Sequence, residues 1–316
     1  MAKYVKISTL NLTAPPLREL PFTGDMERLV ENMIAHLQEN LNKVLPDKPD
    51  IILLPECCDC YGSHSPEQVQ AYYRYRGDRI RDYLCGVAKE HHCYIAYSAV
   101  RCVPEDPEYP FRNSTQILGR NGEIVGVYDK NHLVPFECDG RKMAYGTEIP
   151  VMELDFGRVG CAICFDLNFD ELMYRYAKKR PELILFCSQY HGGIQQKIWA
   201  YKCRAFFAGA IWHNQSPVLN PYGEVVASST NYCGYATARV NLDYALVHLD
   251  DQNSKLDAAK EKYGPLLQIH DPGNVGSMML SYEAADQTVQ DILKEFDMIT
   301  VDAYFDNCRN HRNAHI

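Results

Sequence analysis

The order of strand-like and helix-like segments predicts an α/β fold built on a mixed β-sheet. Residues 51–54 and 183–186 form short, continuously apolar runs, which are typical of buried parallel strands. Segments with apolar residues at helical spacing lie between the strand-like runs. Asn121-Gly122 separates two further strand-like runs and indicates a hairpin, so we expect antiparallel pairs beside the parallel ones.

In the first part of the chain, alternation, spacing and capping residues predict each element. Residues 5–10 alternate apolar and polar side chains, as a strand does. Four apolar residues of 26–41 recur at helical spacing and predict a helix: Leu29, Met33, Ile34 and Leu37. Ser65-Pro66-Glu67-Gln68 combines an N-cap residue, a proline and a glutamine, and predicts one long helix towards Lys89. Residues 94–100 form the next apolar strand.

The second part continues with hairpins, buried strands and helices. Strands are expected at 116–118, 124–128, 151–156, 158–163, 183–186, 211–214 and 217–219, and helices at 169–179 and 195–207. Residues after about Leu249 are polar, lack buried-strand patterns and contain one helix candidate, 284–296. We therefore expect one large domain, 1–249. A C-terminal extension, 250–316, should pack on that domain or across an oligomer interface.

The composition excludes several functional classes. The chain has 316 residues, with 32 Lys and Arg against 41 Asp and Glu, so its formal net charge is −9. Nucleic-acid binding needs clustered cations, so no nucleic-acid partner is expected. No apolar run approaches the roughly 18 residues of a membrane span, and the first residues lack the apolar core of a secretory signal. Thirteen cysteines, an odd number, are best explained as reduced thiols, which predicts a cytoplasmic protein.

Three side chains with catalytic potential stand where predicted strands end. Cys164 follows the strand 158–163 and precedes a predicted helix, where backbone N–H groups can face an oxyanion. A cysteine in this place is alternatively a small buried hydrophobe. Glu56 follows the strand 51–54, and Lys130 follows a hairpin strand; each could equally be a solvated surface residue. Taken singly, the three residues leave both interpretations open.

Together, the three segments resemble the signature segments of the nitrilase, or carbon–nitrogen hydrolase, superfamily. They are Leu54-Pro55-Glu56, Tyr128-Asp129-Lys130-Asn131-His132-Leu133 and Gly160-Cys161-Ala162-Ile163-Cys164-Phe165-Asp166. Further matches follow in the family's order: Asn113-Ser114, Phe169-Asp170-Glu171-Leu172, Cys203-Arg204-Ala205, Asn214 and Pro221-Tyr222-Gly223. The resemblance covers about residues 5–242 and implies a four-layer α-β-β-α sandwich.

The resemblance implies a catalytic site of Glu56, Lys130 and Cys164. Cys164 would attack the carbon of a C–N bond. Glu56 would carry the thiol proton to the leaving amine and then activate water. Lys130 and the backbone N–H of Phe165 would stabilise the oxyanion. Glu137 would orient Lys130 or the substrate amide. Alternatively, Glu137 is an ordinary glutamate of a surface loop. No cofactor is expected, because a thiol and a carboxylate suffice.

The residues after the predicted nucleophile favour an amide substrate and, less strongly, a ureido or carbamoyl one. True nitrilases usually carry Trp-Glu there, whereas this chain has Phe165-Asp166. Asn168 stands where an arginine is common, which favours a neutral or cationic amide over a carbamoyl amino acid. Hydrolysis of N-carbamoyl amino acids is the alternative activity. Tyr61, Tyr190 and His191 occupy positions that the family uses to face the substrate, although Tyr190 and His191 could simply cap a strand end.

Other functions are compatible with the same residues. The chain could be a non-catalytic nitrilase-like scaffold, or a regulator that binds metal through Cys57, Cys58 and Cys60. A structural metal site usually needs four ligands, and this cluster lacks a second pair, so no metal is expected. Acyl transfer to a soluble amine is a further possibility. Family members commonly dimerise through the helices after the cysteine and the Arg-Ala segment, so we expect a homodimer or larger homo-oligomer.

Overall fold

The computed structural model describes residues 3–12, 24–61 and 65–316. Its contacts divide the chain into two units, Lys6–Ala238 and a smaller one that combines Met1–Val5 with Arg239–Ile316. No helix among the described residues is long and apolar enough to cross a membrane. The larger unit carries every residue of the predicted site.

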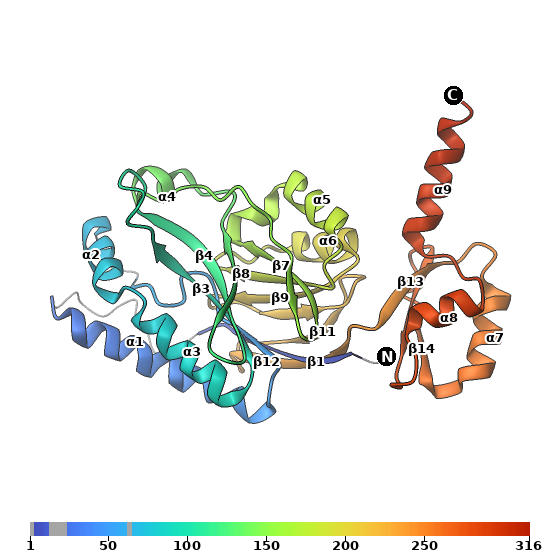
Figure 1. Ribbon diagram of the computed structural model, residues 1–316, viewed down its shortest axis with the longest axis horizontal. Helices are drawn as coiled ribbons and strands as arrows, with labels where there is room; N and C mark the ends of the chain where they lie inside the picture. The colour runs from blue at the N-terminus through green and yellow to red at the C-terminus, as the bar shows by residue number, and fades with distance from the viewer. Residues whose placement is uncertain (1–2, 13–23, 62–64) are drawn as a thin grey trace. The chain divides into compact units, whose positions relative to one another are not determined.

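Two six-stranded sheets form the centre of the fold (Figure 1). The first contains β1 (Tyr4–Leu10), β2 (Ile51–Leu53), β3 (Tyr94–Cys102), β4 (Phe111–Leu118), β5 (Ile124–Asp129) and β12 (Tyr235–Asn241), in the order β12-β1-β2-β3-β4-β5. The second contains β6 (Met152–Leu154), β7 (Gly157–Ile163), β8 (Leu183–Ser188), β9 (Phe206–Ile211), β10 (Pro217–Leu219) and β11 (Val225–Ser228), in the order β11-β10-β9-β8-β7-β6. Parallel pairs such as β1–β2 and β7–β8 lie beside antiparallel pairs such as β3–β4, so both sheets are mixed.

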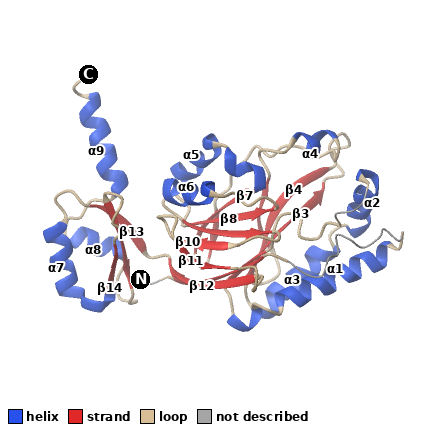
Figure 2. Ribbon diagram, turned by 180° about the vertical axis from the view of Figure 1, so that it is seen from behind, coloured by secondary structure: helices blue, strands red, loops and turns tan. Residues whose placement is uncertain are grey.

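Helices cover the outer face of each sheet (Figures 1 and 2). The first sheet is covered by α1 (Met26–Leu41), α2 (Pro66–Arg76) and α3 (Arg79–His91), and the second by α5 (Asp170–Lys179) and α6 (Ile194–Cys203). Strand β2 contacts β9, and strand β4 contacts β7, so the inner faces of the two sheets meet. The predicted α-β-β-α sandwich is confirmed. Short helical segments complete this unit: η2 (Leu45–Asp47), α4 (Pro135–Asp139) and η3 (Cys164–Asn168).

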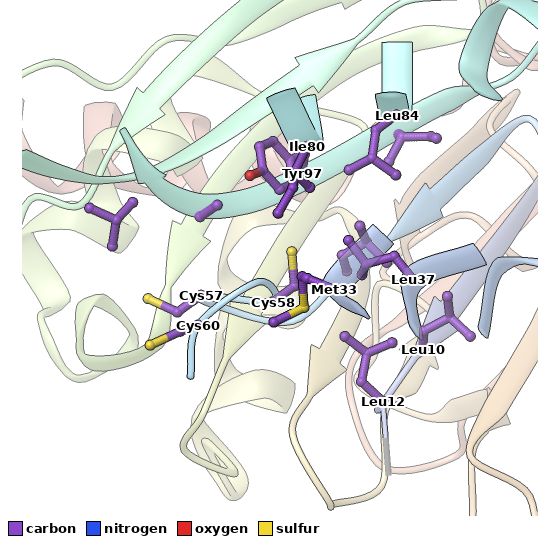
Figure 3. Packing of buried hydrophobic residues seen from close by; sticks show 14 of the residues in the cluster. Leu10, Leu12, Met33, Leu37, Cys57, Cys58, Cys60, Ile80, Leu84 and Tyr97 are labelled. Carbon is purple, nitrogen blue, oxygen red and sulfur yellow. The ribbon is translucent and has the colours of Figure 1, made fainter. Parts of the chain in front are cut away.

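Small side chains let the two sheets approach each other, and large ones fill the space beneath the helices. Thr115 on β4 donates a hydrogen bond to Ser98 on β3 (3.1 Å), and both side chains interact with the Cys187 thiol of β8. Under α1–α3, a buried apolar cluster includes Met33 and Leu84 (Figure 3). Burying each such side chain contributes roughly 1.5–3 kcal/mol, which holds the helices on the sheet.

Two predicted helices are corrected by residues with positive φ. The expected long helix from Ser65 begins with the predicted capping box but is broken at Gly77, whose φ is +52°, so two helices replace one. The predicted helix 195–207 ends at Cys203, because Arg204 takes φ +54° and Phe206 begins strand β9. The capping residues that predicted where the first of these helices begins carry no information on where it ends.

The smaller unit contains strands that the sequence pattern after Leu249 did not predict. It contains the sheet β13-β15-β14, made of β13 (Tyr244–His248), β14 (Leu267–His270) and β15 (Ser277–Tyr282). Its helical segments are α7 (Asn253–Tyr263), η4 (Gly264–Leu266), α8 (Val289–Glu295) and α9 (Val301–Asn313). Leu267, Leu280 and Ile292 lie in its own apolar core. Whether residues 250–316 pack on the domain 1–249 or across an oligomer interface stays a prediction.

Candidate active site

The predicted trio stands on three loops that follow strands of both sheets. Glu56 follows β2, Lys130 follows β5, and Cys164 follows β7 and begins η3. The strands place the loops, but hydrogen bonds between side chains bring the three residues together. The resulting cluster is almost entirely shielded from water, with Glu56 3% and Lys130 1% exposed.

Four donors fix the position of Glu56. Its Oε1 accepts hydrogen bonds from Lys130 Nζ (2.9 Å) and Asn113 Nδ2 (2.8 Å). Its Oε2 accepts one from the backbone N–H of Gln189 (3.0 Å), at the end of β8. The indole N–H of Trp212 donates to the Glu56 backbone oxygen (2.6 Å). The carboxylate therefore has a fixed orientation at the place where the two sheets meet.

Lys130 lies between two carboxylates. Besides Glu56, its Nζ donates to Glu137 Oε2 on α4 (2.7 Å), which also accepts from the backbone N–H of Val134 (2.8 Å). Asn113 Nδ2 bridges the pair, because it donates to Glu137 Oε1 (2.8 Å) as well as to Glu56. The sequence reasoning assigned Asn113 no role at the site; the only signal was its place in the Asn-Ser match to the family.

The charges of this cluster stabilise one another. Burial by itself would lower the pKa of Lys130, but the carboxylates of Glu56 and Glu137 raise it above its ordinary value. Burial would likewise raise the pKa of Glu56, but Lys130 and the hydrogen bond from Asn113 bring it below its ordinary value. At neutral pH the cluster therefore holds an ammonium beside a carboxylate.

Cys164 stands at a strained turn between strand and helix. Its φ is +50°, a backbone conformation that residues other than glycine rarely adopt and that costs of order 1–3 kcal/mol. Its thiol interacts with the side chains of Glu56 and Ser188. Burial, followed by the Glu56 charge, raises the pKa of Cys164 to about 12. At neutral pH the sulfur is therefore protonated and has a base beside it.

Two predicted substrate-facing residues lie together beside Cys164. Asn168 Nδ2 donates to the backbone oxygen of Phe165 (3.1 Å), and its Oδ1 accepts from the Tyr190 hydroxyl (3.2 Å). Burial and then the proximity of Cys164 raise the pKa of Tyr190, whose side chain remains 38% exposed. Asn168 and Tyr190 thus form the exposed side of the cluster.

Other expected side chains lie elsewhere. Tyr61 is in the apolar core, where its hydroxyl donates to the Leu29 backbone oxygen and its ring packs on Tyr72. The ring and the hydroxyl of Tyr61 both have partners in the core, so the expectation that Tyr61 lies beside the substrate is corrected. His191 is exposed, and its Nδ1 accepts from the N–H of Gly193 (3.1 Å), the residue before α6, so this bond lies at the start of a helix and not at the end of a strand. Asp166 is fully buried, so its charge does not face the substrate.

The cysteines after Glu56 belong to the core. Cys57, Cys58 and Cys60 are 0–6% exposed and pack among apolar side chains (Figure 3). Across the described ranges, no group of three or more His, Cys, Asp and Glu side chains is placed to hold a metal ion.

The chain matches one family model along most of its length. The family is described as "Carbon-nitrogen hydrolase", and its model aligns with residues 15–245. The chain belongs to the carbon–nitrogen hydrolase family. This membership confirms the predicted superfamily and, at the level of the family, the expectation of an amidase-like hydrolase.

Curated relatives of this carbon–nitrogen hydrolase include ω-amidases and fusion proteins. "Omega-amidase NIT2-B" of Xenopus laevis is 23% identical over 280 residues, which cover 78% of this chain and 98% of the relative. The nitrilase and fragile histidine triad fusion protein NitFhit of Caenorhabditis elegans is 26% identical over 252 residues. The match spans 70% of this chain but only 55% of the fusion protein, so the chain corresponds to about half of that relative.

Solved structures share the fold. The C. elegans NitFhit structure has a TM-score of 0.62 at 22% identity, and the match covers 83% of this chain and 64% of that one. A glutamate-to-glutamine variant of the amidase from Nesterenkonia sp. AN1 also has a TM-score of 0.62, at 18% identity, covering 80% of this chain and 98% of that one. In that amidase variant, acrylamide has undergone Michael addition at the active-site cysteine.

Proposed function

We propose that this carbon–nitrogen hydrolase cleaves the C–N bond of a small amide through a thioacyl intermediate on Cys164. The observation that carries the proposal is Lys130, held between Glu56 and Glu137 while Glu56 also interacts with the Cys164 thiol. A nucleophile, a base and a fixed cation within one buried cluster are the parts that acyl transfer requires.

In the first half of the reaction, Cys164 Sγ attacks the carbonyl carbon as Glu56 takes the thiol proton. The raised pKa of Cys164 means that the proton leaves during the attack, because little free thiolate exists beforehand. Lys130 and the Phe165 N–H stabilise the negative oxygen. The C–N bond then breaks, the proton on Glu56 passes to the departing nitrogen, and ammonia or an amine is released.

In the second half, water attacks the thioester carbon. Glu56 takes a proton from the water, and the C–S bond breaks as the sulfur recovers a proton. The products are a carboxylic acid and the free enzyme. Glu137 and Asn113 keep Lys130 and Glu56 in place throughout through their hydrogen bonds.

The relatives support an amide as the substrate, with a ureido compound as the less favoured choice. The relatives in sequence include ω-amidases, and a structural relative is an amidase whose active-site cysteine takes acrylamide. The residue pair Phe165-Asp166 agrees with this class. The scaffold alternative is disfavoured because Glu56, Lys130 and Cys164 are all present and Glu56 contacts the other two. A homodimer and a cytoplasmic location belong to the same proposal.

The test is ammonia release from a panel of amides, ureido acids and nitriles, combined with intact-mass detection of adducts. We expect wild type to release ammonia from at least one amide, and Cys164→Ala to release none while remaining folded. Glu56→Gln should accumulate one acyl or acrylamide adduct, mapped to Cys164. Turnover by Cys164→Ala near the wild-type rate, or first modification at Cys57 or Cys58, would refute the mechanism.

A further inference from the structure

A buried carboxylate outside the proposed trio joins the two loops that carry Lys130 and Cys164. Asp166 is 0% exposed and lies two residues after Cys164, in η3. Its side chain contacts Tyr128 on strand β5. The mechanism above gives it no role, yet it accepts four hydrogen bonds from both loops.

The Oδ2 atom of Asp166 joins the ends of β5 and β7. It accepts a hydrogen bond from the Tyr128 hydroxyl (2.7 Å) and one from the backbone N–H of Ile163 (3.0 Å). Tyr128 precedes Lys130 by two residues, and Ile163 directly precedes Cys164. Burial and then the Asp166 charge raise the pKa of Tyr128, so its hydroxyl stays protonated and able to donate.

The Oδ1 atom of Asp166 holds the chain on the other side of Lys130. It accepts from the backbone N–H of His132 (2.8 Å) and lies 3.2 Å from His132 Nδ1. The His132 ring stacks on Phe169, with 3.7 Å between ring centroids, and its Nε2 lies 3.4 Å from Glu171. His132 is therefore fixed between η3 and α5, and the loop after β5 cannot shift without breaking these contacts.

We propose that Asp166 is a positioning residue that fixes Lys130 and Cys164 relative to each other. This inference rests on the function proposed above. A carboxylate can accept all four hydrogen bonds, whereas an amide of the same shape would turn its NH₂ group towards N–H or O–H donors. Displacement of a reacting group by about 1 Å can cost 10²-fold in rate, so the clamp matters for the chemistry as well as for stability. The same contacts hold Cys164 at its strained φ.

The experiment compares Asp166→Asn with Tyr128→Phe and with the control Asp170→Asn, the same chemical change at an exposed position on α5. Against the best amide of the panel, we expect kcat of Asp166→Asn to fall by about 10- to 100-fold with KM within about threefold. Tyr128→Phe, which loses one of the four contacts, should lie between that variant and wild type. A kcat of Asp166→Asn within threefold of wild type would overturn the inference.

A readout that needs no turnover separates this inference from the proposed function. Hydrogen–deuterium exchange should become faster in the peptides covering both 128–133 and 160–168 of Asp166→Asn than in the other peptides, while the lost hydrogen bonds also lower the thermal unfolding midpoint. If wild type hydrolyses no amide, the proposed function fails, but faster exchange in both peptides would still establish the clamp. Unchanged exchange, or faster exchange in only one peptide, would refute it, as would a loss of kcat that merely follows the fraction unfolded.

Discussion

A buried lysine between two carboxylates sets the charge state of the proposed site. Lys130 and Glu56 each incur a desolvation cost, and each is kept charged by the other. A protonated amine cannot act as a nucleophile, so Lys130 acts by charge and borohydride should trap no Lys130 adduct with substrate.

The charge pair also makes the free energy of unfolding depend on pH. Replacing Lys130 should reverse the sign of that dependence.

Replacing Lys130 by methionine should invert the acid response of stability. In wild type, Glu56 has a lowered folded pKa, so its stabilisation is present above about pH 4.3 and is lost as pH falls through that pKa. Without Lys130, burial dominates and raises the folded pKa of Glu56, so stability rises as pH falls from 7 to 5. At pH 7 we expect a loss of about 3–5 kcal/mol.

Thermal unfolding midpoints at pH 5 and pH 7 check this expectation. Lys178→Met, at an exposed position of α5, is the matched control and should behave like wild type. A midpoint of Lys130→Met that is lower at pH 5 than at pH 7 would contradict the role assigned to the buried pair.

The same charges predict the reactivity of Cys164. Burial and the Glu56 carboxylate raise its pKa to about 12, so alkylation by iodoacetamide should keep accelerating beyond pH 10. Glu56→Gln removes the negative charge, which lowers the pKa of Cys164 and should make alkylation at pH 8 severalfold faster. Amide turnover by the same variant should nevertheless be lost. Peptide mapping after a timed pulse gives the rate at Cys164, and slower alkylation of Glu56→Gln would count against this account.

At the scale of elements, the break between α2 and α3 determines how these helices cover the first sheet. The break between α2 and α3 lies at Gly77, where φ is +52°; among the described residues, a Cβ would meet only the Arg74 backbone oxygen, at 4.0 Å. The obstacle to a side chain there is therefore the backbone conformation alone. The break lets α2 and α3 both cover the first sheet, which a single straight helix would not do.

Gly77→Ala should therefore destabilise the protein by about 1–3 kcal/mol, because alanine rarely adopts this conformation. Gly86→Ala is the matched control, since Gly86 lies within α3 and is exposed, and no atom of the residues that the structure describes lies within 4 Å of an added Cβ. It should stabilise the protein by about 0.5–1 kcal/mol. Urea titrations give both values, and equal effects of the two substitutions would show that Gly77 imposes no constraint.

At the scale of the whole molecule, we expect association of two or more copies. The chain mass is 36.1 kDa, so light scattering at micromolar concentration should give at least twice that mass. We expect the contact to involve the helices after Cys164 and at the Arg-Ala segment, which are α5 and α6, and Tyr174 on α5 is 49% exposed. Tyr174→Asp should weaken association, whereas Ile124→Asp, at an exposed apolar residue of β5, should not. A mass near 36 kDa for wild type would reject the prediction.

Most strands and helices of the larger unit could be predicted from the sequence, because their signals are local. Apolar runs, capping residues and the Asn-Gly turn act over a few neighbouring residues. The smaller unit was missed because strands such as β15 are only half-buried and mix apolar with polar residues, so their pattern resembles that of a loop. Its core forms only when distant segments meet.

The sequence by itself determined the fold class and the family. It also proposed Glu56, Lys130 and Cys164 as the site, since each stands at a strand end within a distinctive motif. Only the tertiary structure decided which side chains meet them. Asn113 bridges Glu56 to Glu137, and Asp166 joins the loops of Lys130 and Cys164, through contacts across strands far apart in the chain. Tyr61 likewise lies in the core, because its contacts are made with residues that are distant in the chain. Local pattern fixes where a strand ends, but the direction of a side chain depends on the partners that folding brings within hydrogen-bonding distance.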